Sequence, residues 1–206
     1  MSLLNVWLSE TKALIATDTE SLGQDGVYHE GSKMLHLPHA NVVVGGRGHN
    51  IFLNVVFSML HMGRGGFDEY ESEMPSMLAQ AIAYLEPQQA AFLTTIHAQE
   101  IVLVGYSRSL GRMHCVAYES KDQTGFKVTQ IDQAFLSPWA ESWGMPMKAS
   151  TPQDARIVCT EQVVNGKATD PDAPLGGRLL LAELTRHELK FSTIARLTER
   201  AISKDQ

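Results

Sequence analysis

The sequence has no long apolar run and no basic cluster. None of its apolar stretches reaches the roughly 18 residues that a membrane-spanning helix requires. No positive charge precedes the first apolar segment, as it would in a secretory signal. The formal net charge of −6 argues against nucleic acid or an anionic membrane as the main partner. We therefore expect neither nucleic acid nor a membrane among the partners.

Cysteine is scarce, and the motifs of common cofactor sites are missing. Cys115 and Cys159 are the only cysteines, and they form no C-x-x-C pair, so we predict no zinc site and no disulfide framework. This usage is typical of a reducing cytoplasm. His36 and His39, in "HLPH", lack supporting carboxylates and are interpreted as surface histidines. "GGRGHN" lacks the G-K-[ST] ending of a phosphate loop, so we expect no cofactor and no metal.

The rest of the composition is that of one globular domain. The chain of 206 residues is 44% hydrophobic and 19% charged, which suffices for a sizeable core. There is no linker, internal repeat or low-complexity block. We therefore predict a single domain over residues 1–206.

Apolar periodicity predicts strands and helices in distinct blocks. A hairpin is expected at the N-terminus and a polar loop at 19–32. Helical spacing begins at Asn50, a second helix opens near Pro75, and Thr151 followed by Pro152 is a typical helix start. Strands are predicted at 3–8, 13–18, 33–37, 42–46, 100–107, 113–120, 126–131, 178–184 and 188–194, and helices at 50–62, 74–85 and 151–166. Hairpin-connected strands of this kind indicate an α/β or α+β domain.

Several residues at the corners of this pattern have a familiar order. Asp18 follows Ser2 by 16 residues, Lys33 opens "KMLHL", and a Gly-Gly pair ends at Gly46 before the first helix. "FLSPWAESWG" contains Ser137, and "DPDAPLGGRLLLAEL" contains Asp172. From Ser2 to about Leu189, this order resembles a proteasome β subunit, a family of N-terminal-nucleophile hydrolases.

The resemblance implies an α+β fold, a four-layer αββα sandwich, and a catalytic site. After removal of Met1, Ser2 would be the nucleophile, and its free α-amine the general base. Lys33 would lower the pKa of that amine, and Asp18 would orient Lys33. The backbone N–H of Gly46 would stabilise the oxyanion. Ser137 and Asp172 would orient the amine and a water molecule.

The sequence departs from the family, and every residue has a structural alternative. The first residue is serine rather than threonine, and Leu175 replaces a serine beside the Gly-Gly. Glu20 and its neighbours do not match the basic residue that the family has just after the Asp. Ser2 could be a plain N-terminus, and Lys33 with Asp18 a structural relic. The role of Gly45 and Gly46 could be limited to relieving crowding at a strand end. Ser137 and Asp172 could be turn residues.

Three functions remain open. The first is a cytoplasmic peptidase that assembles as a homo-oligomeric ring and cleaves peptides or unfolded protein. The resemblance also allows an ATPase unfoldase as a partner of this peptidase. The second is a non-catalytic scaffold or binding subunit. The third is a small-molecule amidase of the same superfamily. Specificity would come from the groove near Glu20, Gly31 and Gly45.

Overall fold

The computed structural model describes residues 2–22, 26–85, 99–120, 125–145 and 147–197. Its elements, in chain order, are β1 (Leu4–Leu8), β2 (Lys12–Asp18), β3 (Glu20–Leu22), β4 (Tyr28–Glu30), β5 (Met34–Leu37), β6 (Val42–Arg47), α1 (Asn50–Met62), α2 (Phe67–Leu85), β7 (Gln99–Ser107), β8 (Arg112–Ser120), β9 (Lys127–Ile131), β10 (Ala134–Ser137), the short 3-10 helix η1 (Glu141–Trp143), α4 (Pro152–Thr169), β11 (Arg178–Thr185) and β12 (Leu189–Arg196).

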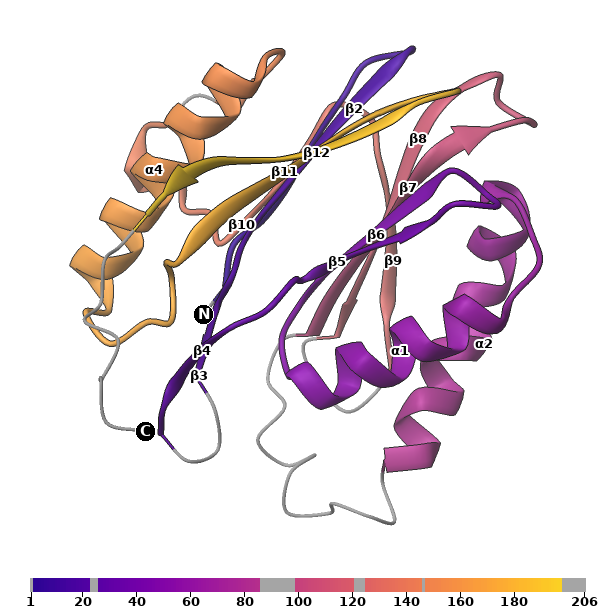
Figure 1. The fold of residues 1–206 in the computed structure, drawn as a ribbon, viewed down its shortest axis with the longest axis horizontal. Helices are drawn as coiled ribbons and strands as arrows, with labels where there is room; N and C mark the ends of the chain where they lie inside the picture. Colours follow the sequence, from indigo (N-terminus) through magenta and orange to yellow (C-terminus); the bar gives the residue numbers. More distant parts are fainter. Residues whose placement is uncertain (1, 23–25, 86–98, 121–124, 146, 198–206) are drawn as a thin grey trace.

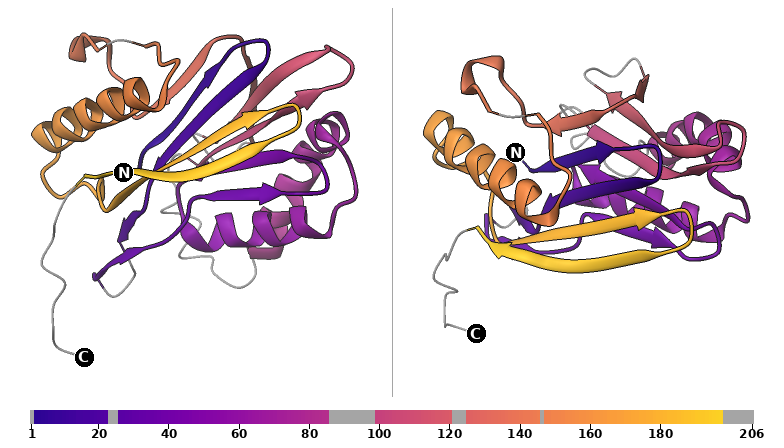
Figure 2. Two further views of the ribbon diagram at one scale, coloured as in Figure 1. Left: turned by 45° about the horizontal axis from the view of Figure 1, so that its top comes forward. Right: turned by 90° about the horizontal axis from the view of Figure 1, so that it is seen from above.

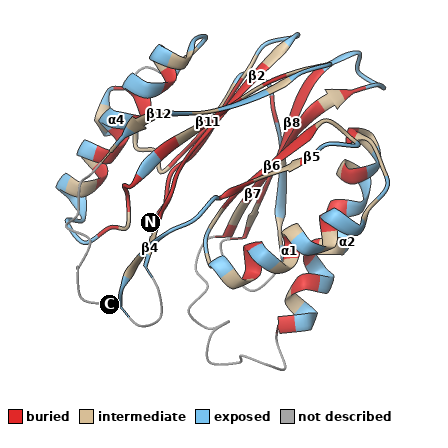
Figure 3. Ribbon diagram, viewed as in Figure 1, coloured by how far each residue is buried: buried red, intermediate tan, exposed pale blue. Residues whose placement is uncertain are grey.

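Two five-stranded antiparallel sheets form the centre of the molecule (Figure 1). The first has the order β10-β1-β2-β11-β12 and the second β5-β6-β7-β8-β9, while β3 and β4 form a separate hairpin. The central strands are buried on both faces, as Figure 3 shows. This burial explains why they read as continuous apolar runs such as "VVV" in β6 and "IVLV" in β7.

The two sheets pack face to face through one apolar cluster. It draws on β1 and β2 of the first sheet and on β6, β7 and β8 of the second. Its fully buried members include Leu4, Ile15, Val43, Val102 and Cys115. The β1–β2 register, with Val6 opposite Ile15, directs alternate residues of both strands into this layer.

Helices cover the outer sides (Figure 2). α1 and α2 pack on the second sheet through residues that include Phe52, Val56 and Leu78, and α4 packs on the first sheet through Val158 and its neighbours. The N-terminus of α4 is as predicted: the Thr151 hydroxyl accepts from the Asp154 N–H, and the Asp154 carboxylate accepts from the Thr151 N–H.

The prediction of a four-layer αββα sandwich is wrong. The described residues are mainly β, in three antiparallel sheets with only three α-helices, and α4 alone covers the outer side of the first sheet. After Thr169, a turn leads directly into β11, and β11 and β12 extend the sheet instead of adding a helix. The four-layer description came from the resemblance, whereas the periodicity of the chain predicted only three helices among its strands.

The start of the second helix also differs from the prediction. α2 begins at Phe67, so Pro75 lies inside the helix and cannot donate a hydrogen bond to the Glu71 carbonyl, four residues earlier. The Tyr118 hydroxyl donates to that carbonyl instead, at 3.3 Å. A contact from β8 thus compensates for the proline, which no local signal could reveal.

Three short strands lie where the sequence predicted loops or turns. β3 and β4 form a hairpin within the predicted polar loop, and β10 pairs with β1 along the segment that contains Ser137. All three have few residues and weak alternation, so their pairing depends on neighbouring strands.

Candidate functional site

Ser2, Asp18 and Lys33 lie together at one end of the two sheets. Ser2 precedes β1, Asp18 ends β2, and Lys33 precedes β5 of the other sheet. The Lys33 Nζ donates to the Ser2 Oγ at 3.0 Å and to the Asp18 Oδ1 at 2.7 Å. It also donates to the backbone carbonyl of Glu20 at 2.5 Å. All three residues are almost inaccessible, with Ser2 8%, Lys33 3% and Asp18 0% exposed.

Backbone donors hold the Asp18 carboxylate in place. The Leu3 N–H donates to Oδ1 at 2.8 Å, and the Gly176 N–H donates to Oδ2 at 3.2 Å. Sequence reasoning missed Gly176, although the "LGG" corner that contains it was part of the resemblance. Leu175, at the place of the expected serine, is fully buried in the apolar cluster beneath α4.

The buried environment of Lys33 shifts its pKa. Burial lowers the pKa of the Lys33 ammonium, while the carboxylates of Asp18 and Glu20 oppose that shift and the Arg47 guanidinium adds to it. A lysine with a lowered pKa, in contact with a serine hydroxyl, can accept the proton of that hydroxyl. The cluster therefore has the parts of an activated nucleophile.

The Gly46 N–H, predicted as the oxyanion donor, already has a partner. Its N–H donates to the Lys33 carbonyl at 2.8 Å, so it is not available to a substrate oxyanion. A Cβ at Gly45 would lie 2.7 Å from the Leu4 Cδ1, and one at Gly46 would collide with Leu53 of α1. The two glycines thus permit close packing, which is the structural alternative given for them.

Ser137 lies beside the cluster, and no hydrogen bond joins it to Ser2 within the described residues. It pairs in register with Leu4, its N–H donates to the Asn5 Oδ1 at 3.2 Å, and its hydroxyl accepts from the Arg47 guanidinium.

Asp172 is not brought to the cluster. The residue is exposed in a turn, its N–H donates to the Asp170 Oδ1, and its carbonyl accepts from the Tyr28 hydroxyl. A turn role, the alternative given for it, fits this position.

Sequence reasoning missed Arg47 and Glu100. They face each other in the β6–β7 register, and the Arg47 Nη1 lies 3.0 Å from both oxygens of the Glu100 carboxylate. The sequence signal for this pair was a charged residue beside each apolar run. Such a residue is typical of any strand end, so it does not identify the pair.

Two pockets adjoin these residues. One, of about 130 Å³, is lined by Ser21, Gly31, Ser32, Lys33, Asn50, Leu53, Asn54 and Phe57. The other, of about 340 Å³, is lined by Arg47, Glu100, Glu119, Phe135, Leu136, Ser137, Pro138 and Trp139. Gly31 lines the pocket beside Lys33, whereas Glu20 and Gly45 line neither pocket.

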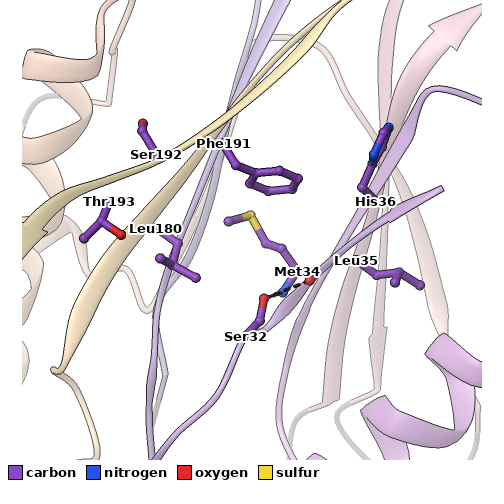
Figure 4. A pocket seen from close by; sticks show the side chains of 8 residues that line it. All are labelled: Ser32, Met34, Leu35, His36, Leu180, Phe191, Ser192 and Thr193. Carbon is purple, nitrogen blue, oxygen red and sulfur yellow. Dashed lines mark hydrogen bonds between the residues drawn. The ribbon is translucent and has the colours of Figure 1, made fainter. Parts of the chain in front are cut away.

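A third pocket, of about 390 Å³, lies between β5 and the β11–β12 pair (Figure 4). His36 and Phe191 approach each other there, with ring centroids 6.4 Å apart. None of the six predicted site residues lines this pocket, whose residues are Ser32, Met34, Leu35, His36, Leu180, Phe191, Ser192 and Thr193.

The described residues show neither a metal site nor a membrane-spanning helix. No group of three or more His, Cys, Asp or Glu side chains in them is arranged to hold a metal ion. His39, one of the two histidines considered for such a site, instead shares a hydrogen bond with the Tyr70 hydroxyl at 2.8 Å. None of the described helices combines the length and apolar character needed to cross a bilayer.

The fold and the site define a class: a protein of two facing antiparallel sheets with a buried Ser–Lys–Asp cluster at one end. No protein-family model and no curated protein matches the sequence. Solved structures do match. Anbu (ancestral beta-subunit) from Yersinia bercovieri has a TM-score of 0.62 and 11% identity, over 100% of this chain and 88% of that one. The Anbu (Gly-1) mutant from Hyphomicrobium sp. strain MC1 has a TM-score of 0.61 and 9% identity, over 95% and 88%.

These comparisons correct the assignment to the proteasome β-subunit family. Identities of 9% and 11% show a likeness of fold alone, and no family model supports membership. The ordered motifs indicated how the chain folds around Ser2, and the family assignment made from them is wrong.

Proposed function

We propose that this protein is a hydrolase that cleaves peptide bonds, with Ser2 as its nucleophile. The observation that carries the proposal is the contact of the Lys33 Nζ with both the Ser2 Oγ, at 3.0 Å, and the Asp18 carboxylate, at 2.7 Å. A serine hydroxyl is a weak nucleophile unless a base takes its proton, and this contact places against it an amine that can act as a base in its neutral form. A structural ion pair would not require the serine.

The reaction would proceed through an acyl-enzyme. The Ser2 Oγ attacks the peptide carbonyl and its proton passes to a base; the C–N bond then breaks and the leaving amine takes up a proton. Water hydrolyses the resulting ester and regenerates the hydroxyl. Gly46 has no part in this proposal, because its N–H is bonded to Lys33.

Two groups can serve as the base. The free α-amine of Ser2, exposed by removal of Met1, is the base expected from the sequence. The Lys33 amine is the alternative that the geometry favours, since it contacts the hydroxyl directly and burial lowers its pKa. An N-terminal extension that cannot be removed blocks the α-amine and leaves every lysine unmodified, so it separates them: it abolishes activity if the α-amine is the base and spares it if Lys33 is.

A homo-oligomeric ring in the cytoplasm is the assembly we propose. The fold likeness to a protein whose name includes "ancestral beta-subunit" supports assembly from repeated subunits. Both Cys115 and Cys159 are buried and free, which fits a reducing compartment. Light scattering tests the ring: one chain weighs 22.7 kDa, and a mass of that size for the purified protein would contradict it.

The enzymatic proposal is tested with untagged protein and a panel of fluorogenic peptides. We expect hydrolysis by the wild type, loss of at least about 10²-fold in Ser2→Ala, and no loss in Ser9→Ala. Ser9 is a matched control because it lies in the turn of the same hairpin, where its hydroxyl bonds only to Lys12. Equal rates in the wild type and Ser2→Ala would refute the proposal.

A further inference from the structure

Arg47 connects the two sheets at the end where Ser2 and Lys33 meet. It is the last residue of β6, and its Nη1 lies 3.0 Å from both oxygens of Glu100 on β7 of the same sheet. The same Nη1 donates to the hydroxyl of Ser137 on β10, which belongs to the other sheet. Only 15% of the Arg47 side chain and 14% of the Glu100 side chain are exposed, so solvent screens this contact little.

A buried amide network fixes the far side of this contact. The Ser137 N–H donates to the Asn5 Oδ1, and the Asn5 Nδ2 donates to the Gln162 Oε1 of α4 at 2.5 Å. The Gln162 Nε2 donates to the Pro138 carbonyl at 2.9 Å and to the Asn5 Oδ1 at 3.1 Å. Asn5 and Gln162 are 0% exposed. Because buried amides are costly unless bonded, this network resists displacement of β10 relative to β1 and α4.

The contact between Ser2 and Lys33 also spans the two sheets. Ser2 precedes β1 in one sheet and Lys33 precedes β5 in the other. Arg47 follows Gly46, whose N–H bonds to the Lys33 carbonyl, and Ser137 pairs with Leu4, two residues after Ser2. The Arg47–Ser137 hydrogen bond therefore joins the residue after the bonded partner of Lys33 to the strand that pairs with β1 two residues after Ser2.

We propose that Arg47, Glu100 and Ser137 form an inter-sheet bridge that sets the separation of the Ser2 hydroxyl and the Lys33 amine, with Arg47 as a positioning residue for hydrolysis. This inference rests on the proposed function. A displacement of about 1 Å at a reacting group can cost on the order of 10²-fold in rate. The bridge is placed to prevent such a displacement.

The bridge also acts on Lys33 electrostatically. The charged groups that face Lys33 are Asp18, Glu20 and Arg47, and the cation of Arg47 lowers the pKa of Lys33 while the two carboxylates raise it. Removing the Arg47 charge should raise that pKa. Neutralising Glu100 leaves the Arg47 charge uncompensated and should lower it. A purely structural bridge would not produce opposite shifts.

The test compares Arg47→Met, Arg47→Lys and Glu100→Gln with the wild type. The pH dependence of hydrolysis is measured together with the NMR titration of Lys33 in protein labelled with ¹³C-lysine, its signal assigned through Lys33→Met. We expect Arg47→Met to lose about 10²-fold in rate and to move both the acid limb and the Lys33 titration to higher pH. Arg47→Lys keeps the charge, so it should lose rate while its titration stays near that of the wild type. Glu100→Gln should move the titration to lower pH.

Lys12→Met is the matched control. The Lys12–Glu183 ion pair, at 2.6 Å, joins β2 and β11 within one sheet and should affect neither readout. The Lys33 titration needs no turnover, so it reports on the bridge even if Ser2→Ala refutes the proposed function. A wild-type rate and titration in Arg47→Met, or shifts in the same direction for Arg47→Met and Glu100→Gln, would overturn the inference.

Discussion

The buried pair of Asp18 and Lys33 gives the sharpest prediction for stability. Its charged atoms are 2.7 Å apart, and the side chains are 0% and 4% exposed. Removing one member of such a pair leaves an uncompensated buried charge, which typically costs about 3–5 kcal/mol. Lys33→Met would strand the Asp18 carboxylate with only two backbone donors, and Asp18→Asn would strand the Lys33 ammonium.

The double variant separates an ion pair from two independent contributions. If each single substitution costs about 4 kcal/mol, independent effects would add to about 8 kcal/mol. Asp18→Asn with Lys33→Met removes both charges, so neither remains buried without its partner. We expect the double variant to cost about 5 kcal/mol, which corresponds to a coupling free energy of about 3 kcal/mol.

Urea denaturation followed by circular dichroism measures these free energies of unfolding. The Lys12–Glu183 pair serves as control, because 35% of the Lys12 side chain is exposed and its removal should cost no more than about 1 kcal/mol. Costs that simply add in the double variant would show that Asp18 and Lys33 do not act as a pair, and would refute the reasoning.

Three further predictions concern the fold around the site. Tyr118→Phe leaves the Glu71 carbonyl without its hydrogen bond and should lower the free energy of unfolding in urea by about 1–2 kcal/mol. The cost should be smaller in a Pro75→Ala background, because the backbone N–H of Ala can then bond to that carbonyl. Equal costs in the two backgrounds would contradict this. Burial lowers the pKa of His49 from 6.5 to about 4, so the free energy of unfolding should decline as pH falls from 6.5 towards 4. His49→Asn, which keeps a helix-capping side chain, should reduce that decline in unfolding curves measured across this range, and an unchanged decline would count against it. Gly45→Ala should lower stability by about 1–3 kcal/mol through its clash between the sheets, and a neutral result would contradict that packing.

Local signals in the sequence predicted much of the secondary structure. The β1–β2 hairpin and the start of α4 at Pro152 follow from alternation, helix capping and the preference for proline in a first helical turn. α1 follows from helical spacing after Asn50. The signals that predict these elements lie within a few neighbouring residues of the chain.

Other elements depend on contacts between distant residues. α2 continues through Pro75 because Tyr118, 43 positions later, bonds to the carbonyl that the proline leaves free. β10 becomes a strand because β1 offers it an edge. Neither partner can be identified from the local sequence, so rules for single segments give the wrong boundaries.

The residues of the candidate site also differ in how far the sequence predicts their positions. The meeting of Ser2, Asp18 and Lys33 was expected only through a resemblance, whose family assignment the comparisons do not support. Asp172 was carried over by motif order, but its turn places it at the surface. The contact of Arg47 with Glu100 and Ser137 depends on sheet register and on how the two sheets face each other, which single-strand patterns do not contain.

The most direct test of Ser2 as a nucleophile is mass spectrometry of untagged protein treated with an N-terminus-directed β-lactone. We predict that Met1 is absent from the intact mass, that one probe adduct forms, and that peptide mapping places it on Ser2. Lys33→Met should lose the adduct, and Lys12→Met should keep it. A protein that retains Met1 and forms no adduct on Ser2 would contradict the proposed function.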